Sequence, residues 1–201
     1  METRDHRRLA EYWFEKAECN LRRSYRLAFI FGNIEPDINK LTYLHGFRKQ
    51  KKFRGHNYDN VMPTLLRMLK KDMEKPLTLY RCYHIGKCFH YIADCFTFPH
   101  NAEFTGTMRE HLEYEAELHK QLMRVLSSEA PLILPYSVSF TALKDRLEKL
   151  HYEYQDEHHN PAQDCSYILA AAQLLLQECL LPQWEMCNQK FPKEIAQRRV
   201  A

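Results

Sequence analysis

The chain of 201 residues contains only five glycines, against many Leu, Glu, Lys, Arg and Ala residues. This balance favours helices over sheets. The chain also lacks a long apolar run, because the longest, residues 168–176, is interrupted by Gln173. A run of that length is too short to span a bilayer, so the sequence predicts no transmembrane segment. No signal-peptide pattern is visible near the N-terminus. We therefore expect a cytoplasmic protein, or a secreted one if a leader has been removed.

A strong charge of one sign is also lacking. The net charge of +3 is too small to indicate binding to nucleic acid or to a membrane by itself. The seven cysteines form no C-x-x-C pair, and an odd number without an export signal indicates reduced thiols, most of them in the core. Histidine, by contrast, is abundant, with eleven residues in the chain. The spacing of these histidines therefore decides how the sequence is interpreted.

Apolar residues recur at intervals of three and four along the chain, which predicts helices and no strands. We expect one all-α domain over residues 1–201, a bundle of about six to eight helices. The expected helices cover roughly residues 6–31, 60–73, 77–96 and 107–126, then a helix from a cap at Ser137 or Ser139 to residue 154, and a last long one over residues 161–181. The first helix is expected to stop at Gly32, before a turn that contains Asp37.

Two histidine–acid pairs have the same spacing of four residues. His90 and Asp94 lie on one face of the strongly apolar third predicted helix. A carboxylate there is costly to bury unless a cation or several donors satisfy it. His111 and Glu115 lie on the next helix, in a stripe that continues into leucines and therefore faces inward. His100, in the turn between the two helices, can reach either pair.

Imidazole and carboxylate groups are ligands that zinc prefers in proteins. A single pair of this kind is more often a surface pair or a satisfied core pair. Two pairs within 26 residues, both on inward faces and around one further histidine, instead favour a binuclear zinc site.

The residues that form these pairs also resemble a known family. The string H-Y-I-A-D-C-F-T-F-P-H-N begins at His90, and R-E-H-L-E-Y-E begins at Arg109. Both are similar to the signature of the zinc-dependent phospholipase C family, which is related to the S1/P1 nucleases. Upstream, G-N-I-E-P-D ending at Asp37 and R-G-H-N-Y around His56 resemble two further motifs of that family. The resemblance covers about residues 28 to 120.

The resemblance implies an all-α hydrolase with a zinc cluster in its core. The implied ligands form two sets: His56, His90 and Asp94 for one zinc, and His100, His111 and Glu115 for a second. Asp37 matches an acidic residue beside the metals, which the family uses both as a ligand and as the general base. A third zinc is left open, since secreted members use the amino group of a mature N-terminal Trp that is not present here. His6 is a candidate for the accompanying ligand, but a solvated histidine at a helix start is the preferred interpretation.

The implied function is cleavage of the head-group phosphodiester of a phospholipid by metal-activated water, with Asp37 as the catalytic residue. An S1/P1-type nuclease or another phosphoesterase is the enzymatic alternative, and nucleic acid is a partner only in that case. The alternative from another class of protein is a helical domain in which zinc is structural and non-catalytic. Neither the head group nor the oligomeric state follows from the sequence.

The other histidines are expected to have ordinary roles: His45, His84, His119, His151, His158 and His159. Those from residue 151 onward lie in a polar segment and are expected to be solvated. His119 is expected to be packed or exposed, or to contact a ligand from behind. A basic run over residues 48–54 is interpreted as a solvated loop, although its place just before His56 also fits attraction of anionic groups.

Overall fold

The computed structural model describes residues 1–16, 21–39, 41, 56–72, 76–128 and 140–177. In these parts it has seven α-helices, one short 3-10 helix and no strand. The elements are α1 (Thr3–Lys16), α2 (Arg23–Ile38), α3 (Tyr58–Asp72), α4 (Leu79–Cys95), η3 (Phe98–His100), α5 (Met108–Leu126), α6 (Phe140–Gln155) and α7 (Pro161–Leu175). The predicted all-α fold is confirmed. None of the described helices combines the length and the apolar character that a bilayer crossing requires.

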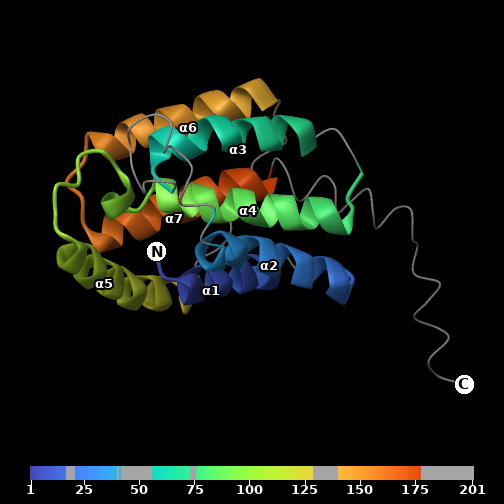
Figure 1. Ribbon diagram of the computed structural model, residues 1–201, viewed down its shortest axis with the longest axis horizontal. Coiled ribbons are helices and arrows are strands. Elements are labelled where there is room, and N and C mark those ends of the chain that lie inside the picture. The colour runs from blue at the N-terminus through green and yellow to red at the C-terminus, as the bar shows by residue number, and fades with distance from the viewer. Residues whose placement is uncertain (17–20, 40, 42–55, 73–75, 129–139, 178–201) are drawn as a thin grey trace, which may run out of the picture.

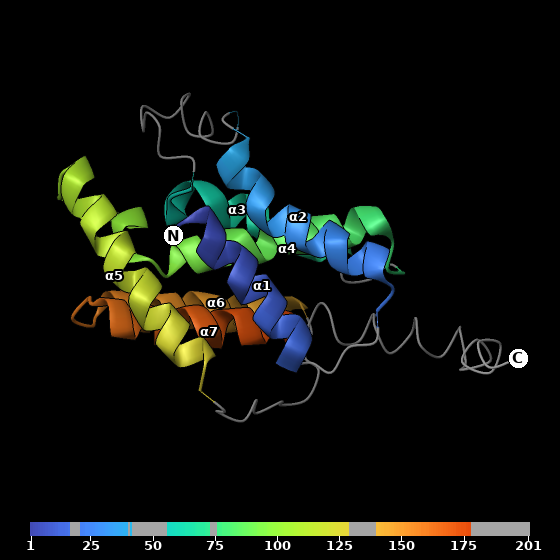
Figure 2. The same cartoon turned by 90° about the horizontal axis from the view of Figure 1, so that it is seen from below.

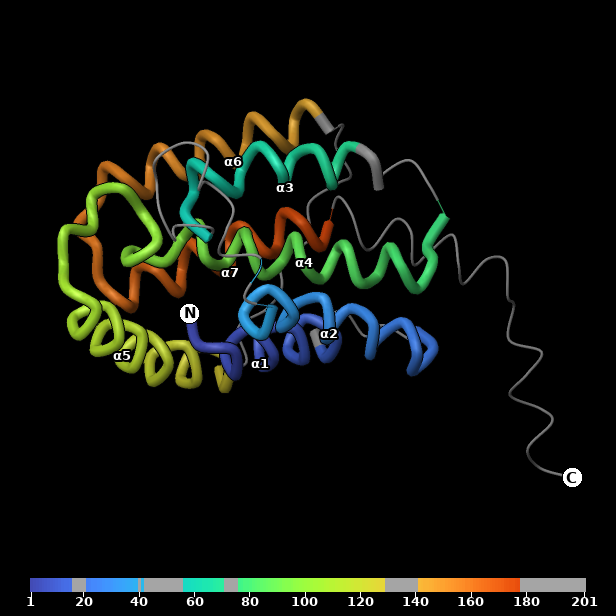
Figure 3. Tube along the Cα trace, in the orientation of Figure 1, coloured from blue at the N-terminus to red at the C-terminus, as the bar shows by residue number. Residues whose placement is uncertain are grey.

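Helix α4 is the centre of the bundle. It packs against α1, α2, α3 and α7, and most of its residues from Cys82 to Cys95 are buried. Figure 1 shows α3 and α6 side by side on one side of α4 and α7, and α1, α2 and α5 on the other. From below, α1 lies between α5 and α2 (Figure 2). The chain begins close to α5, near the end of α4 that carries Asp94 (Figure 3).

The single helix expected over residues 6–31 is two helices, so this prediction was wrong. Helix α1 ends at Lys16, and Arg22 has non-helical backbone angles before α2 begins. The two helices pack against each other, with the Phe14 ring edge-on to the Phe29 ring at 5.0 Å. The apolar spacing is alike on both sides of the break, so periodicity did not reveal it. A change of direction is needed because one straight helix cannot bring both apolar faces to the same core.

The expected helix end at Gly32 was also wrong, because α2 continues through Gly32 and Pro36 to Ile38. Pro36 lies in the last turn, where its missing N–H removes one helical hydrogen bond without ending the helix. Asp37 therefore lies on a helix and not in a turn. A glycine can end a helix by adopting a left-handed conformation, but Gly32 has a different role.

Gly32 and Gly86 allow α2 and α4 to approach each other closely. A Cβ at Gly32 would lie 2.0 Å from the carbonyl oxygen of Tyr83, and a Cβ at Gly86 would lie 2.1 Å from that of Phe29. Real Cβ atoms do not come this close to backbone atoms. The absence of a side chain at these two positions thus determines the distance between the two helices that carry Asp37 and His90.

The remaining helices agree with the predictions to within a few residues. Helix α5 begins with a capping box, in which the Thr107 hydroxyl accepts from the Glu110 N–H and the Glu110 carboxylate accepts from the Thr107 N–H. Helix α7 begins at Pro161 after Asn160, whose side chain accepts from two backbone N–H groups. The caps expected at residues 137 or 139 and the helix expected beyond residue 177 lie outside the described residues.

Candidate metal centre

The buried end of α4 brings the first predicted ligand set together. The carboxylate oxygen Oδ2 of Asp94 lies 3.1 Å from His56 Nδ1 and 3.2 Å from His90 Nε2. The two imidazole nitrogens are 3.4 Å apart, and all three side chains are buried. Helix α4 places His90 and Asp94 on one face, whereas His56 precedes the first turn of α3. Long-range packing of α3 on α4 thus completes the set.

The surroundings of His90 define which of its ring nitrogens carries a proton and which presents a lone pair to this cluster. Its Nδ1 lies 2.9 Å from the backbone oxygen of Asn33, which can only accept, so Nδ1 carries a proton and donates it. In a neutral imidazole, Nε2 then presents a lone pair to the Asp94 carboxylate at 3.2 Å. Two acceptors at this distance need a positive charge between them, either a second proton or a metal ion. A histidine that donates to a carbonyl from its other nitrogen is typical of metal sites.

The second predicted set meets at one oxygen atom. Glu115 Oε1 lies 3.3 Å from His100 Nε2 and 3.0 Å from His111 Nε2. Burial raises the pKa of Glu115, but hydrogen bonds from His100 and His111 outweigh burial and hold the pKa below its usual range. Helix α5 carries His111 and Glu115, and the 3-10 helix that follows α4 carries His100.

A cation lies between the two sets in this structure. The α-amino group of Met1 is 3.2 Å from Asp94 Oδ1 and 2.8 Å from Glu115 Oε1. Burial lowers the pKa of this group, but the two carboxylates outweigh burial and raise it to about 11. The space between Asp94 and Glu115 therefore favours positive charge strongly. The same electrostatics, with imidazole nitrogens around it, fit a zinc ion.

His6 forms a third group with Asp37 and His90, although the sequence interpretation preferred a solvated position for it. Its ring is fully buried, stacks on the His90 ring at 3.8 Å, and brings Nε2 to 3.2 Å from Asp94 Oδ1. Burial, and then the neighbouring His90, lower the pKa of His6 to about 4. The interpretation of His6 as a solvated residue was therefore wrong. Its spacing of three and seven residues before Leu9 and Trp13 on the apolar face was the signal that it points inward.

Asp37 lies beside the first set at the end of α2. Its Oδ1 is 3.7 Å from His90 Nε2 and 3.9 Å from His56 Nδ1. Among the residues that the structure describes, three groups have ligand atoms that lie within 4.8 Å of one another: His56, His90 and Asp94; His100, His111 and Glu115; and His6, Asp37 and His90. All seven predicted site residues occur in these groups, together with His6.

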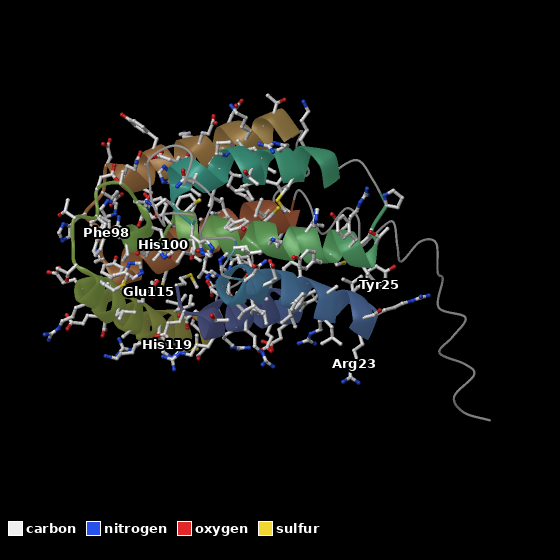
Figure 4. The ribbon with its side chains drawn as sticks, in the orientation of Figure 1. Arg23, Tyr25, Phe98, His100, Glu115 and His119 are labelled. Carbon is white, nitrogen blue, oxygen red and sulfur yellow. The ribbon has the colours of Figure 1, made fainter. Side chains whose placement is uncertain are left out.

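A cavity of about 400 Å³ opens onto this cluster. Five predicted ligands line it: Asp37, His56, His100, His111 and Glu115. His90 and Asp94 lie behind them and are fully buried. Figure 4 shows His100 and Glu115 close together at the end of the molecule away from Arg23 and Tyr25. The cavity makes the candidate ligands accessible to a substrate.

Several other histidines differ from the expectation. His151 is buried, with its ring stacked on that of Tyr58 at 3.4 Å, so the prediction that it is solvated was wrong. His159 is half-buried against the ring of Phe98, whereas His158 is exposed as expected. His119 forms an ion pair with the buried Asp5. His45 and the basic run 48–54 lie outside the described residues.

The fold and the clustered side chains define an all-helical protein with buried histidine and carboxylate groups that could hold metal ions. The family "Zinc dependent phospholipase C" matches residues 6–161, which include every candidate ligand named above. The chain belongs to the zinc-dependent phospholipase C family, a family of hydrolases, and the predicted resemblance is confirmed. Comparisons with curated proteins and with solved structures gave no match.

Proposed function

We propose that this protein is a zinc-dependent phosphodiesterase that cleaves the head-group phosphodiester of a phospholipid. The observation that carries the proposal is the cavity, which reaches ligand candidates of both sets at once. A zinc ion that serves only as a staple is enclosed by protein ligands, whereas a catalytic ion keeps a position open for water or substrate. A cavity bordered by five of the candidate ligands supports the catalytic case.

The residues proposed to hold zinc are the two sets described above: His56, His90 and Asp94 for one ion, and His100, His111 and Glu115 for a second. His6, Asp37 and His90 form a third group, at which a further zinc ion could be held. Zinc held there would supply positive charge that polarises a water molecule and draws in the phosphate oxygens. The donation from His90 Nδ1 to the Asn33 carbonyl oxygen orients the ring and leaves Nε2 available as a ligand.

Asp37 is the proposed general base. Its carboxylate lines the cavity within 4 Å of two imidazoles, so it can accept a proton from a water molecule that attacks phosphorus. The new bond joins the water oxygen to phosphorus, and the bond from phosphorus to the diacylglycerol oxygen breaks. That oxygen takes up a proton as it leaves.

The described walls of the cavity favour a lipid over a nucleic acid. Met108 and Leu112 line the cavity on the first turns of α5 and are 72 % and 58 % exposed, and Pro99 adds a further apolar contact. Among the described lining residues there is no Phe, Tyr or Trp on which a nucleotide base could stack. Apolar side chains beside the reacting phosphate suit the glycerol and acyl part of a phospholipid.

The test is turnover with and without zinc on phosphatidylcholine vesicles, phosphatidylinositol vesicles, single-stranded DNA and an aryl phosphodiester. We expect zinc-dependent release of diacylglycerol from the vesicles. Asp37→Asn should keep its zinc, measured by plasma mass spectrometry, and lose roughly 10²- to 10⁴-fold in turnover, as general bases do. Asp145→Asn, on the exposed surface of α6, is the matched control and should keep full activity.

Three results would contradict parts of this proposal. Full activity of Asp37→Asn would exclude the base role. Cleavage of DNA without cleavage of lipid would identify a nuclease. Bound zinc without turnover on any of the four substrates would favour the non-catalytic staple.

A further inference from the structure

We propose that Asp164 is a positioning residue, which holds the segments that carry His100, His111 and Glu115 in place through hydrogen bonds to neighbouring residues. This rests on the proposed function, in which that set holds zinc. Asp164 lies in the first turn of α7, just beyond residues 6–161 that match the family, and is not itself a ligand candidate. Its side chain is fully buried.

The Asp164 carboxylate accepts hydrogen bonds from three different elements. Its Oδ2 accepts from the backbone N–H of Phe98 at 2.9 Å and from the hydroxyl of Tyr114 at 2.9 Å. Its Oδ1 accepts from the hydroxyl of Tyr154 at 2.8 Å. The three donors belong to η3, α5 and α6, so one carboxylate joins these elements to α7.

Two of the three donors lie within two residues of a candidate ligand in sequence. Phe98 begins the 3-10 helix that ends with His100, and Tyr114 directly precedes Glu115 on α5. Adjacent residues on a helix point in directions about 100° apart, so a bond at Tyr114 toward α7 sets the direction in which Glu115 points. The same rotation of α5 sets His111, one turn earlier. The shared oxygen Oδ2 thus keeps the two segments of the set in register with each other.

The need for such an anchor follows from the position of α5. Its first turns are largely exposed, from Met108 to Glu113, and its buried leucines begin only at Leu118, so the Tyr114 bond is the contact on α5 nearest to the ligand candidates. Burying the Asp164 carboxylate costs folding free energy. Burial raises the pKa of Asp164 to about 6, although its hydrogen-bond donors act to lower the pKa. A costly buried acid beside a candidate site supports a role in positioning.

The Asp164 contacts also distinguish the two ligand sets. The first set and His6 lie on α1, α4 and the segment before α3, and none of the three bonds reaches those residues. Loss of a supporting bond should therefore weaken zinc binding at the second set and leave the first set unchanged.

The test compares two variants that each remove one hydroxyl from the same carboxylate. Tyr114→Phe removes a donor on the ligand-bearing α5, and Tyr154→Phe removes a donor on α6, which carries no candidate ligand. Zinc dissociation constants are measured by competition with a chromophoric chelator, and melting temperatures by circular dichroism. We expect both variants to melt lower, but only Tyr114→Phe to bind zinc about tenfold more weakly, the size usual for supporting contacts.

A double variant assigns the effect to one set. In a His111→Ala background the second set is disabled, so adding Tyr114→Phe should not change the affinity for the zinc that is left. Equal zinc affinity in Tyr114→Phe and Tyr154→Phe, or an effect of Tyr114→Phe that survives in His111→Ala, would overturn the positioning role. Absence of zinc binding in the unsubstituted protein would overturn the proposed function as well, and is seen before any variant is compared.

Discussion

At the scale of single residues, the candidate ligands are oriented by backbone groups and polar side chains behind them. His90 donates to the carbonyl oxygen of Asn33, which fixes its tautomer. Behind His100, the amide nitrogen of Asn101 donates to the carbonyl oxygens of Cys95 and Thr97 at 3.1 and 3.0 Å. These bonds hold the turn between α4 and α5 in one conformation. The orientation of the candidate ligands therefore depends on residues that no metal-ligand pattern identifies.

His151 extends this arrangement. Because the Asn101 amide nitrogen faces two carbonyl oxygens, its Oδ1 is the atom that lies 3.0 Å from His151 Nε2, and an amide oxygen only accepts. His151 Nε2 therefore carries a proton and donates. Burial lowers the pKa of His151 to about 4, so the ring is neutral in the folded protein at neutral pH.

The first prediction concerns the pH dependence of stability. Between about pH 6.5 and pH 4 the unfolded chain binds a proton at residue 151 that the folded chain does not. The stability that His151 contributes is thus complete above pH 6.5 and declines as the pH falls toward 4. His151→Gln should cost roughly 1–3 kcal/mol of unfolding free energy at pH 8, as loss of a buried hydrogen-bonding partner does, and clearly less at pH 4.5. Urea denaturation in the presence of a chelator measures both values.

His158→Gln, at an exposed site in the following loop, is the control and should show no pH-dependent difference from the unsubstituted protein. A cost of His151→Gln that is the same at both pH values would show that His151 titrates normally in the folded state.

At the scale of the elements, the contact between α2 and α4 brings Asp37 close to His90. Helix α2 supplies Asn33 and Asp37, and α4 supplies His90 and Asp94. The lack of a Cβ at Gly32 and Gly86 sets how closely these helices approach. The geometry between Asp37, the proposed base, and the candidate ligands His90 and Asp94 is thus a property of a helix pair.

The second prediction tests this contact with Gly86→Ala. The added methyl group meets the Phe29 carbonyl oxygen at 2.1 Å, so α2 and α4 must separate. We expect a loss of roughly 1–3 kcal/mol in unfolding free energy, as for other overpacked cores, and weaker zinc binding as well. Urea denaturation and zinc titration measure the two effects.

Gly106→Ala is the matched control, because its methyl group would meet only the far end of the Phe104 side chain in an exposed loop. Wild-type stability and zinc affinity in Gly86→Ala would show that the helices can accommodate the methyl group and that their spacing does not govern the centre.

At the scale of the whole molecule, the candidate ligands come from six separate segments. They are His6 on α1, Asp37 on α2, His56 before α3, His90 and Asp94 on α4, His100 on η3, and His111 and Glu115 on α5. Each candidate group combines residues from two or three of these segments, so a metal ion held there would bind the folded chain and not the unfolded one. Metal binding should therefore contribute to the stability of the fold.

The third prediction is that removal of zinc lowers the melting temperature. At a free zinc concentration a thousand times the dissociation constant, binding adds about 4 kcal/mol to the free energy of unfolding. Melting is followed by circular dichroism with zinc and with a chelator. The double variant His90→Ala and His111→Ala should melt at the same temperature in both conditions, whereas His84→Ala, away from the centre, should respond like the unsubstituted protein. An unsubstituted protein that melts identically with and without chelator would contradict the ligand assignment.

The sequence by itself determined the helices and the spacing of the site. Apolar periodicity predicted α3, α4 and α5 to within a few residues, because it is a local property of the chain. The spacing of four residues placed His90 with Asp94 and His111 with Glu115, since positions four apart share one face of a helix. That these residues bind zinc stays a prediction, although the structure brings their ligand atoms within 4.8 Å in each group.

Only the tertiary structure decided the rest. The break between α1 and α2, the close contact at Gly32, and the burial of His6 and His151 all depend on segments far apart in the sequence. The Asp164 contacts join residues up to 66 positions apart. Periodicity reports which face of a helix is apolar, but not which helix will cover it or which polar group on that helix will meet it. Those choices follow from the packing of the whole bundle, where each buried polar group has to find its partner.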